Sequence, residues 1–146
     1  MDEVAPRVQY AALPFRVKGG QALVMLVTTR DTGRWIIPKG WPKRTVKPRK
    51  MAAREAYEEA GILGRVGKRP CGAFRYTKRL DNGESVACEV QVYPFEVRRE
   101  LVEWPEMGQR RRLWTAPAEA ALLVRDPDLA ELLRTVPFPC AKGRRG

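Results

Sequence analysis

Three glutamates in the segment 51–62 are spaced so that their carboxylates share one face of a helix. Glu55 stands three residues before Glu58 and four before Glu59, and side chains at these spacings are neighbours on a helix surface. Three like charges so placed disfavour an isolated helix, and a bound divalent cation would relieve the repulsion. Because carboxylate oxygens are the ligands that Mg²⁺ prefers, the spacing is compatible with a hard-metal site, although Glu-rich helix faces are usually just solvated.

A basic segment stands directly before these glutamates. No acidic residue lies between Asp31 and Glu55, whereas eight cations do: Arg34, Lys39, Lys43, Arg44, Lys47, Arg49, Lys50 and Arg54. Cations followed at once by carboxylates would hold a polyphosphate and its metal side by side. A solvated basic loop before a solvated acidic helix face is the alternative that spacing alone leaves open.

The charge balance and the missing residue types narrow the chemistry further. The chain has 28 Lys and Arg against 17 Asp and Glu, a net charge of +11, and such a surface attracts polyanions. It has no histidine, which excludes Ser-His-Asp and Cys-His mechanisms and imidazole metal sites. A general base must therefore be a carboxylate, Lys, Tyr or Cys, and a hard-metal site must be built from oxygen.

The elements that position these residues follow from periodicity and turn residues. Pro48 suits the first turn of a helix and Gly61 its C-terminal cap, while Gly19-Gly20 and Asn82-Gly83 predict hairpin turns. The expected strands are 8–17, 21–30, 35–37, 70–80, 85–96 and 111–115, and the expected helices are 48–60, 117–124 and 127–135. This order predicts an α/β or α+β layered fold, with 1–146 as one domain and 1–7 and 139–146 as loose termini.

The residues from Gly40 to Ile62 resemble the Nudix box, G-x5-E-x7-R-E-U-x-E-E-x-G-U. Gly40 matches its first glycine, and its second half reads Arg54-Glu55-Ala56-Tyr57-Glu58-Glu59-Ala60-Gly61-Ile62. The first Glu of the box is Val46 here, which removes one carboxylate that often supports the metal. The resemblance implies an α/β/α sandwich with a mixed central sheet, and a pyrophosphohydrolase that cleaves a diphosphate bond.

The resemblance also implies roles for the carboxylates. Glu58 and Glu59 would bind Mg²⁺ or Mn²⁺, with the backbone carbonyl of Lys39 or Gly40 as a further oxygen ligand. Glu55 would either bind metal or orient and deprotonate the attacking water. No covalent enzyme intermediate is needed.

Two further catalytic residues are implied. Arg54 would hold the carboxylates by charge-assisted hydrogen bonds. Many family members add a glutamate from a later loop, and the candidates here are Glu100, Glu103 and Glu106. We prefer Glu106, because it stands close before the run Arg110–Arg112.

The substrate is expected to be a small molecule with several phosphates. Arg34, Lys39, Lys43 and Arg44 are the candidate phosphate-binding residues. The Pro38-Lys39-Gly40 entry and the basic loop are similar to the diphosphoinositol-polyphosphate and diadenosine-polyphosphate branch of the family, and a nucleoside-diphosphate-linked substrate stays open.

Two alternative functions remain at this level. A catalytically silent Nudix-fold ligand-binding protein is favoured by Val46, and an RNA 5′-end pyrophosphohydrolase is permitted by the net charge without any RNA-binding motif. Neither a secretory signal nor a membrane-spanning run is visible, so a cytoplasmic location without membrane attachment is expected. The sequence does not predict the oligomeric state.

Overall fold

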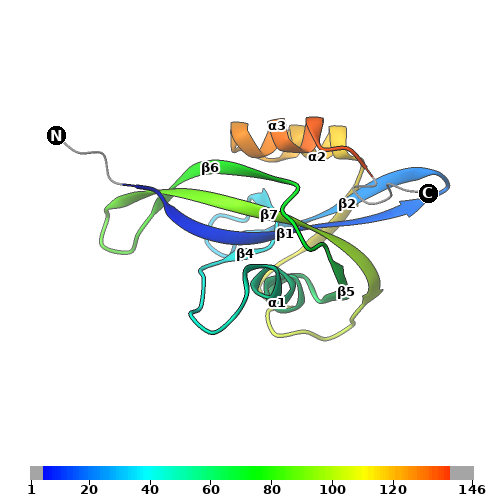
Figure 1. Ribbon diagram of the computed structural model, residues 1–146, viewed down its shortest axis with the longest axis horizontal. Coiled ribbons are helices and arrows are strands. Elements are labelled where there is room, and N and C mark those ends of the chain that lie inside the picture. Colours follow the sequence, from blue (N-terminus) through cyan, green and yellow to red (C-terminus); the bar gives the residue numbers. More distant parts are fainter. Residues whose placement is uncertain (1–4, 139–146) are drawn as a thin grey trace.

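The computed structural model describes residues 5–138, which form one mixed sheet with helices on both of its faces (Figure 1). The strands are β1 (Arg7–Lys18), β2 (Gln21–Thr28), β3 (Trp35–Ile36), β4 (Lys39–Gly40), β5 (Ile62–Val66), β6 (Gly72–Arg79), β7 (Ser85–Glu100) and β8 (Arg112–Thr115). The helices are α1 (Pro48–Ala60), α2 (Pro117–Leu123) and α3 (Pro127–Thr135).

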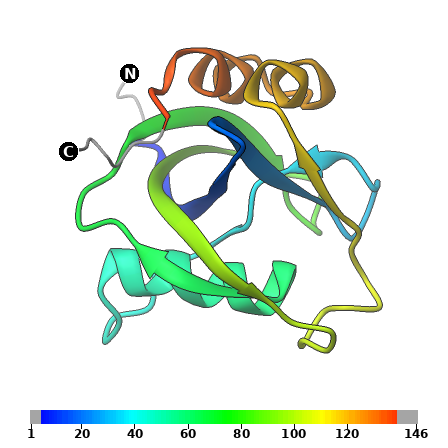
Figure 2. The same ribbon diagram turned by 90° about the vertical axis from the view of Figure 1, so that its right-hand side faces the viewer.

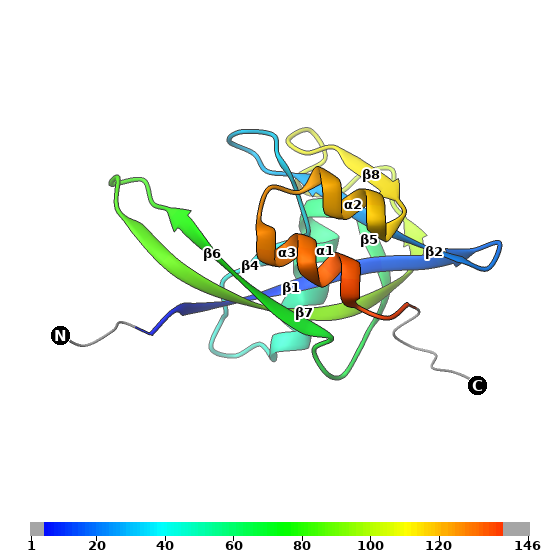
Figure 3. The same ribbon diagram turned by 90° about the horizontal axis from the view of Figure 1, so that it is seen from above.

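The two longest strands, β1 and β7, run parallel through the middle of the sheet, with Ala11 opposite Val92. Near its C-terminal end β1 pairs antiparallel with β2, and nearer its start it pairs antiparallel with β4. The β1–β2 turn and the β6–β7 turn therefore extend at opposite ends of the molecule (Figure 3). The short strand β4 brings Lys39 and Gly40 to the middle of β1.

Apolar side chains cover both faces of the sheet. Along β1, Ala11, Ala12 and Leu13 are each 0% exposed although successive side chains point to opposite faces, the pattern of a strand covered on both sides. Helix α1 lies on one face, and α2 and α3 lie on the other (Figures 1 and 2). Full burial of a large apolar side chain such as Phe74 contributes about 1.5–3 kcal/mol.

Helix α1 begins and ends where the sequence predicts. Pro48 occupies its first turn, and Gly61 ends it in the left-handed conformation with φ 65°, which glycine adopts without the steric cost of a Cβ. Ala52, Ala56 and Ala60 are fully buried, so small side chains let the helix pack closely on the sheet. The predicted mixed sheet with helices is confirmed.

Several boundaries differ from the sequence-based expectation. The pairs β4–β1 and β5–β7 were not expected, since neither segment alternates apolar and polar residues and both are held by non-local pairing. Strand β7 continues to Glu100, β2 ends at Thr28, and Arg7 already belongs to β1 rather than to a loose terminus. The expectation for 139–146 lies outside the described residues.

Candidate active site

Glu55 and Glu59 lie on consecutive turns of α1, beside strand β4. Glu59 is buried, at 7% exposure, and Glu55 is half-buried. Their carboxylates are close enough to share a hydrogen bond. A Cβ at Gly40 would overlap the Glu55 carboxylate, so the backbone of β4 lies directly against this carboxylate.

The pKa values of both glutamates are raised. Burial raises the pKa of Glu59 to about 8, Arg110 opposes that rise, and the neighbouring Glu55 carboxylate adds to it. Burial also raises the pKa of Glu55, and the nearby charges of Glu58 and Glu106 add to the rise. Two carboxylates that repel each other in a buried position favour a shared proton or a bound cation.

Arg110 links this pair to the loop before β8. Its Nη2 lies 3.4 Å from Glu59 Oε2, and its Nε donates to Glu106 Oε1 at 2.6 Å. Its Nη1 donates to the Thr28 carbonyl at 3.0 Å. The guanidinium, on a side chain that is only 9% exposed, is an internal counter-ion shared by two carboxylates. Sequence reasoning missed this role, although the closeness of Arg110 to Glu106 was its one signal.

The structure brings one of the three candidate loop glutamates to this pair. The Glu106 amide donates to the Glu58 carbonyl at 3.1 Å, which places Glu106 against the end of α1. Glu100 instead pairs with Arg16 at 3.1 Å and accepts from Trp114 Nε1 at 2.9 Å. Glu103 is exposed.

Glu58 and Arg54 are more exposed than Glu59. Glu58 is half-buried, Arg54 is exposed, and within residues 5–138 neither side chain forms an ion pair. The expected roles of Glu58 as a metal ligand and of Arg54 as the residue that holds the carboxylates therefore stay predictions.

Two of the four expected phosphate-binding residues, Lys39 and Arg34, contact other side chains of the protein. The ammonium of Lys39 lies 4.8 Å from the centre of the Tyr76 ring, and Arg34 lies 3.7 Å from Asp126. Burial lowers the pKa of Lys39 to about 8, and the negative charge of Glu59 opposes that shift. Lys43 and Arg44 are exposed on the loop before α1.

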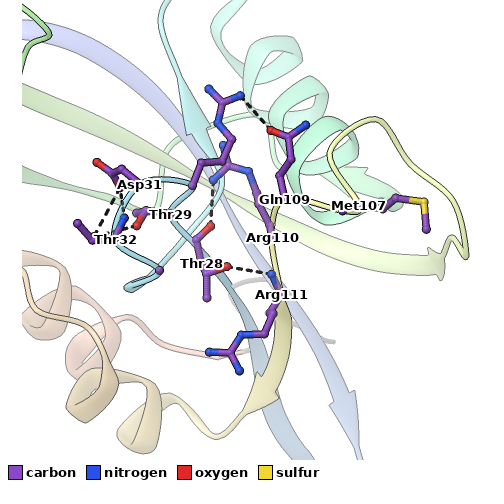
Figure 4. Close-up of a pocket in the computed structure, with 11 residues that line it drawn as sticks. Thr28, Thr29, Asp31, Thr32, Met107, Gln109, Arg110 and Arg111 are labelled. Carbon is purple, nitrogen blue, oxygen red and sulfur yellow. Dashed lines mark hydrogen bonds between the residues drawn. The ribbon is translucent and has the colours of Figure 1, made fainter.

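An open pocket of about 510 Å³ adjoins the glutamates through Arg110 (Figure 4). Its walls are the β2–β3 turn, residues 28–33, and the loop segment 107–111. Arg30 Nη1 donates to Gln109 Oε1 across it at 3.2 Å, and the Arg111 amide donates to Thr28 Oγ1 at 2.9 Å. Sequence reasoning did not foresee this pocket, because its two walls are far apart in the chain.

The donor set fits a hard cation in type. Glu55, Glu59 and the Gly40 carbonyl would offer oxygen ligands, and Mg²⁺ in enzymes is commonly held by one or two carboxylates together with waters and substrate phosphates. In residues 5–138 no three acidic or cysteine side chains gather closely enough to form a metal site by themselves. The site thus offers two grouped carboxylates rather than a closed cage.

Comparisons with known proteins agree on one family. Diphosphoinositol polyphosphate phosphohydrolase 2 of Rattus norvegicus is 30% identical over 135 residues, which cover 90% of this chain and 71% of that protein. Nudix hydrolase 13, mitochondrial, of Arabidopsis thaliana is 29% identical over 107 residues, or 70% of this chain and 53% of that protein. The chain thus spans about half the length of Nudix hydrolases 13 and 12 of Arabidopsis thaliana. No family model matches it.

Solved structures show the same fold at low identity. A C. elegans Ap4A hydrolase superposes with a TM-score of 0.63 at 16% identity, covering 89% of this chain and 95% of that one. The NUDIX domain of Shewanella oneidensis NrtR, complexed with ADP ribose, gives 0.61 at 14% identity, covering 90% and 86%.

A mixed sheet between helical layers, with paired glutamates on the first helix, therefore defines a Nudix-fold protein. With the 30% identity to the rat phosphohydrolase, the chain belongs to the Nudix hydrolase family. The resemblance seen in residues 40–62 is confirmed. Among residues 5–138, no helix is long and apolar enough to cross a membrane.

Proposed function

We propose that this protein hydrolyses a diphosphate bond in a small polyphosphorylated substrate and that it requires Mg²⁺ or Mn²⁺. The observation that carries the proposal is the Glu55–Glu59 pair, in which Glu59 is buried and Glu55 lies against Gly40. A buried pair of repelling carboxylates is costly unless a cation or proton accompanies it. The names of the relatives, a diphosphoinositol polyphosphate phosphohydrolase and an Ap4A hydrolase, support the substrate class.

Some of these residues are proposed to bind the metal, and others to activate the attacking water. Glu59, Glu58 and the Gly40 carbonyl are the proposed ligands, and Glu55 either joins them or takes the proton of the attacking water. When bound, the cation neutralises the diphosphate and lowers the pKa of that water. Glu106, held by Arg110, is the loop carboxylate nearest to this reaction. The water oxygen bonds to one phosphorus, the bridging P–O bond breaks, and the second phosphate leaves.

The cations before α1 are proposed to bind the remaining phosphates. Lys39 contacts the Tyr76 ring and Arg34 pairs with Asp126. Lys43 and Arg44 lie on the exposed loop, where their side chains can reach the phosphates of substrates of different size. Their charges belong to a net charge of +11, which attracts a polyanion from a distance. The expected cytoplasmic location stays a prediction, since the plant relatives carry mitochondrial or chloroplastic names.

One assay tests the proposal. Purified protein is incubated with Mg²⁺ or Mn²⁺ and inositol pyrophosphates, diadenosine polyphosphates, nucleotide sugars, nucleoside triphosphates or 5′-triphosphorylated RNA, and released phosphates are separated by chromatography. We expect metal-dependent cleavage of a small polyphosphate that Glu59→Gln lowers by at least about 100-fold. Glu131→Gln, on the exposed surface of α3, is the matched control and retains activity.

A ligand-binding protein without turnover is the second candidate, and Val46 is the observation that favours it. This residue lies in the turn before α1, where its amide donates to the Lys43 carbonyl at 3.0 Å, and it offers no carboxylate to a metal. Metal-independent binding of one compound, with no cleavage of any, would replace the hydrolase by this candidate. Selective cleavage of the RNA would instead name an RNA 5′-end pyrophosphohydrolase.

A further inference from the structure

The loop between β7 and β8, together with the start of β8, is hydrogen-bonded to consecutive backbone carbonyls at the C-terminal end of α1. Four consecutive carbonyls there accept hydrogen bonds from residues that the helix does not contain. The Glu58 carbonyl accepts from the Glu106 amide at 3.1 Å, that of Glu59 from Trp104 Nε1 at 3.2 Å, that of Ala60 from Arg112 Nη1 at 3.0 Å and that of Gly61 from the Leu101 amide at 2.8 Å.

This arrangement answers a need that every helix has. The last carbonyls of a helix lack partners within it and carry a partial negative charge. Helix α1 has no basic residue in its own last turn, so the guanidinium of Arg112, from β8, supplies the positive charge. The same Nη1 also donates to the Leu101 carbonyl at 3.2 Å, which ties the start of the loop to the helix end.

Trp104 and Arg112 also contact each other. The guanidinium carbon lies 4.0 Å from the centre of the Trp104 ring, a cation–π distance. A Cβ at Gly61 would overlap the indole, so the ring packs directly on the backbone that ends α1. We call this pair of side chains the Trp104–Arg112 clamp.

The clamp encloses the part of the loop that reaches the active site. Glu106 and Arg110 lie between its two residues in the sequence, and Arg110 is the group that contacts both Glu106 and Glu59. Because Glu106 and Glu59 come from segments far apart in the chain, their relative place depends on how the loop sits on α1. The hydrogen bonds to the consecutive carbonyls of α1 fix the position of the loop on the helix.

We propose that Trp104 and Arg112 are positioning residues, which clamp the loop to α1 and thereby hold Glu106 and Arg110 against Glu59. The effect on turnover rests on the proposed function, whereas the placement of the Arg110 side chain does not. The clamp touches neither the grouped carboxylates nor the cations before α1, so its loss should lower kcat and leave KM nearly unchanged.

Two variants remove the clamp by different amounts. Trp104→Phe keeps an aromatic ring and deletes the donor to the Glu59 carbonyl, and Arg112→Ala deletes the cation. Trp114→Phe is the matched control, because it also deletes one indole donor, to Glu100 at 2.9 Å, and Arg16 also stacks on its ring, at 4.2 Å. If Arg112→Ala does not fold, Trp104→Phe still carries the test.

The first readout needs no activity. In ¹⁵N NMR spectra the Arg110 Nε–H, bonded to Glu106, should give a signal protected from solvent exchange, assigned by its absence from Arg110→Lys. We expect Trp104→Phe and Arg112→Ala to lose this protection and Trp114→Phe to keep it. Protection that survives in both clamp variants overturns the proposal.

The second readout is kinetic. At a temperature where all variants are folded, we expect the clamp variants to lose roughly 10- to 100-fold in kcat, the range for a misplaced catalytic group, with KM changed less than about twofold. Unchanged kcat in an active protein overturns the proposal. If the wild-type protein cleaves no compound of the panel, the proposed function fails, and the NMR readout alone decides whether the clamp positions Arg110.

Discussion

Glu59 shows how a single buried carboxyl couples folding to pH. Its carboxyl is buried next to another carboxyl, and Arg110 compensates for only part of that cost, since the same guanidinium also pairs with Glu106. Without metal, the folded protein therefore holds a proton here that the unfolded chain releases. A cation that displaces this proton makes metal affinity depend on pH.

The pH dependence of stability follows from this proton. Between pH about 4.5, the usual pKa of a glutamate, and pH about 8, the pKa of Glu59 in the folded protein, the folded state binds more protons than the unfolded chain. The stability that the Glu59 proton contributes is therefore complete below this pH range and is lost as the pH rises through it. In EDTA we expect the free energy of unfolding to fall from pH 5 to pH 8 by on the order of 2 kcal/mol more in wild type than in Glu59→Gln.

Urea unfolding at several pH values measures this difference. Added Mg²⁺ should raise the stability of the wild-type protein more at pH 8 than at pH 6, because at the higher pH less proton must be displaced. Parallel pH profiles for wild type and Glu59→Gln would show that the carboxyl is ionised throughout.

At the scale of elements, the sequence predicts those helices and strands that depend on local residues, and it does not predict those that depend on pairing with a distant segment. Helix α1 lies where the sequence predicts a helix at about 48–60, because Pro48, Gly61 and the alanine stripe are all local. The same spacing predicts that Glu55 and Glu59 are neighbours. Strand β5 and the role of Arg110 are not predictable, since each depends on a partner that the fold brings from a distant segment.

The close approach of α1 to the sheet gives a prediction at this scale. Ala56 is 0% exposed, at a position where the Nudix box carries a larger aliphatic residue. The surrounding side chains therefore already fill the space that a larger residue at position 56 would occupy. We expect Ala56→Val to destabilise the protein by about 1–3 kcal/mol through overpacking, measured by urea unfolding. Ala118→Val, on the exposed side of α2, should change stability by less than about 0.5 kcal/mol. Equal effects of the two variants would mean that α1 has room to move.

At the scale of the whole molecule, the acidic site sits in a strongly basic protein. The net charge of +11 attracts a polyphosphate, while the carboxylates of α1 would repel it unless metal is bound. Distant charges act on the encounter and are screened by salt, whereas buried pairs such as Arg110–Glu59 are screened much less. Substrate capture and turnover should therefore respond differently to ionic strength.

The exposed pair Lys43 and Arg44 tests this separation. We expect Lys43→Gln/Arg44→Gln to raise KM for the preferred substrate roughly fivefold or more at low salt, with kcat nearly unchanged. The difference should shrink as ionic strength rises from about 0.01 M to about 0.15 M, where the screening length falls from about 30 Å to about 8 Å. Arg98→Gln/Arg134→Gln removes the same charge from cations that already pair with Glu96 and Glu131, so net charge alone cannot explain a difference between the two double variants. If both raise KM equally, the general field of the protein captures the substrate, and Lys43 and Arg44 lose their assignment as phosphate-binding residues.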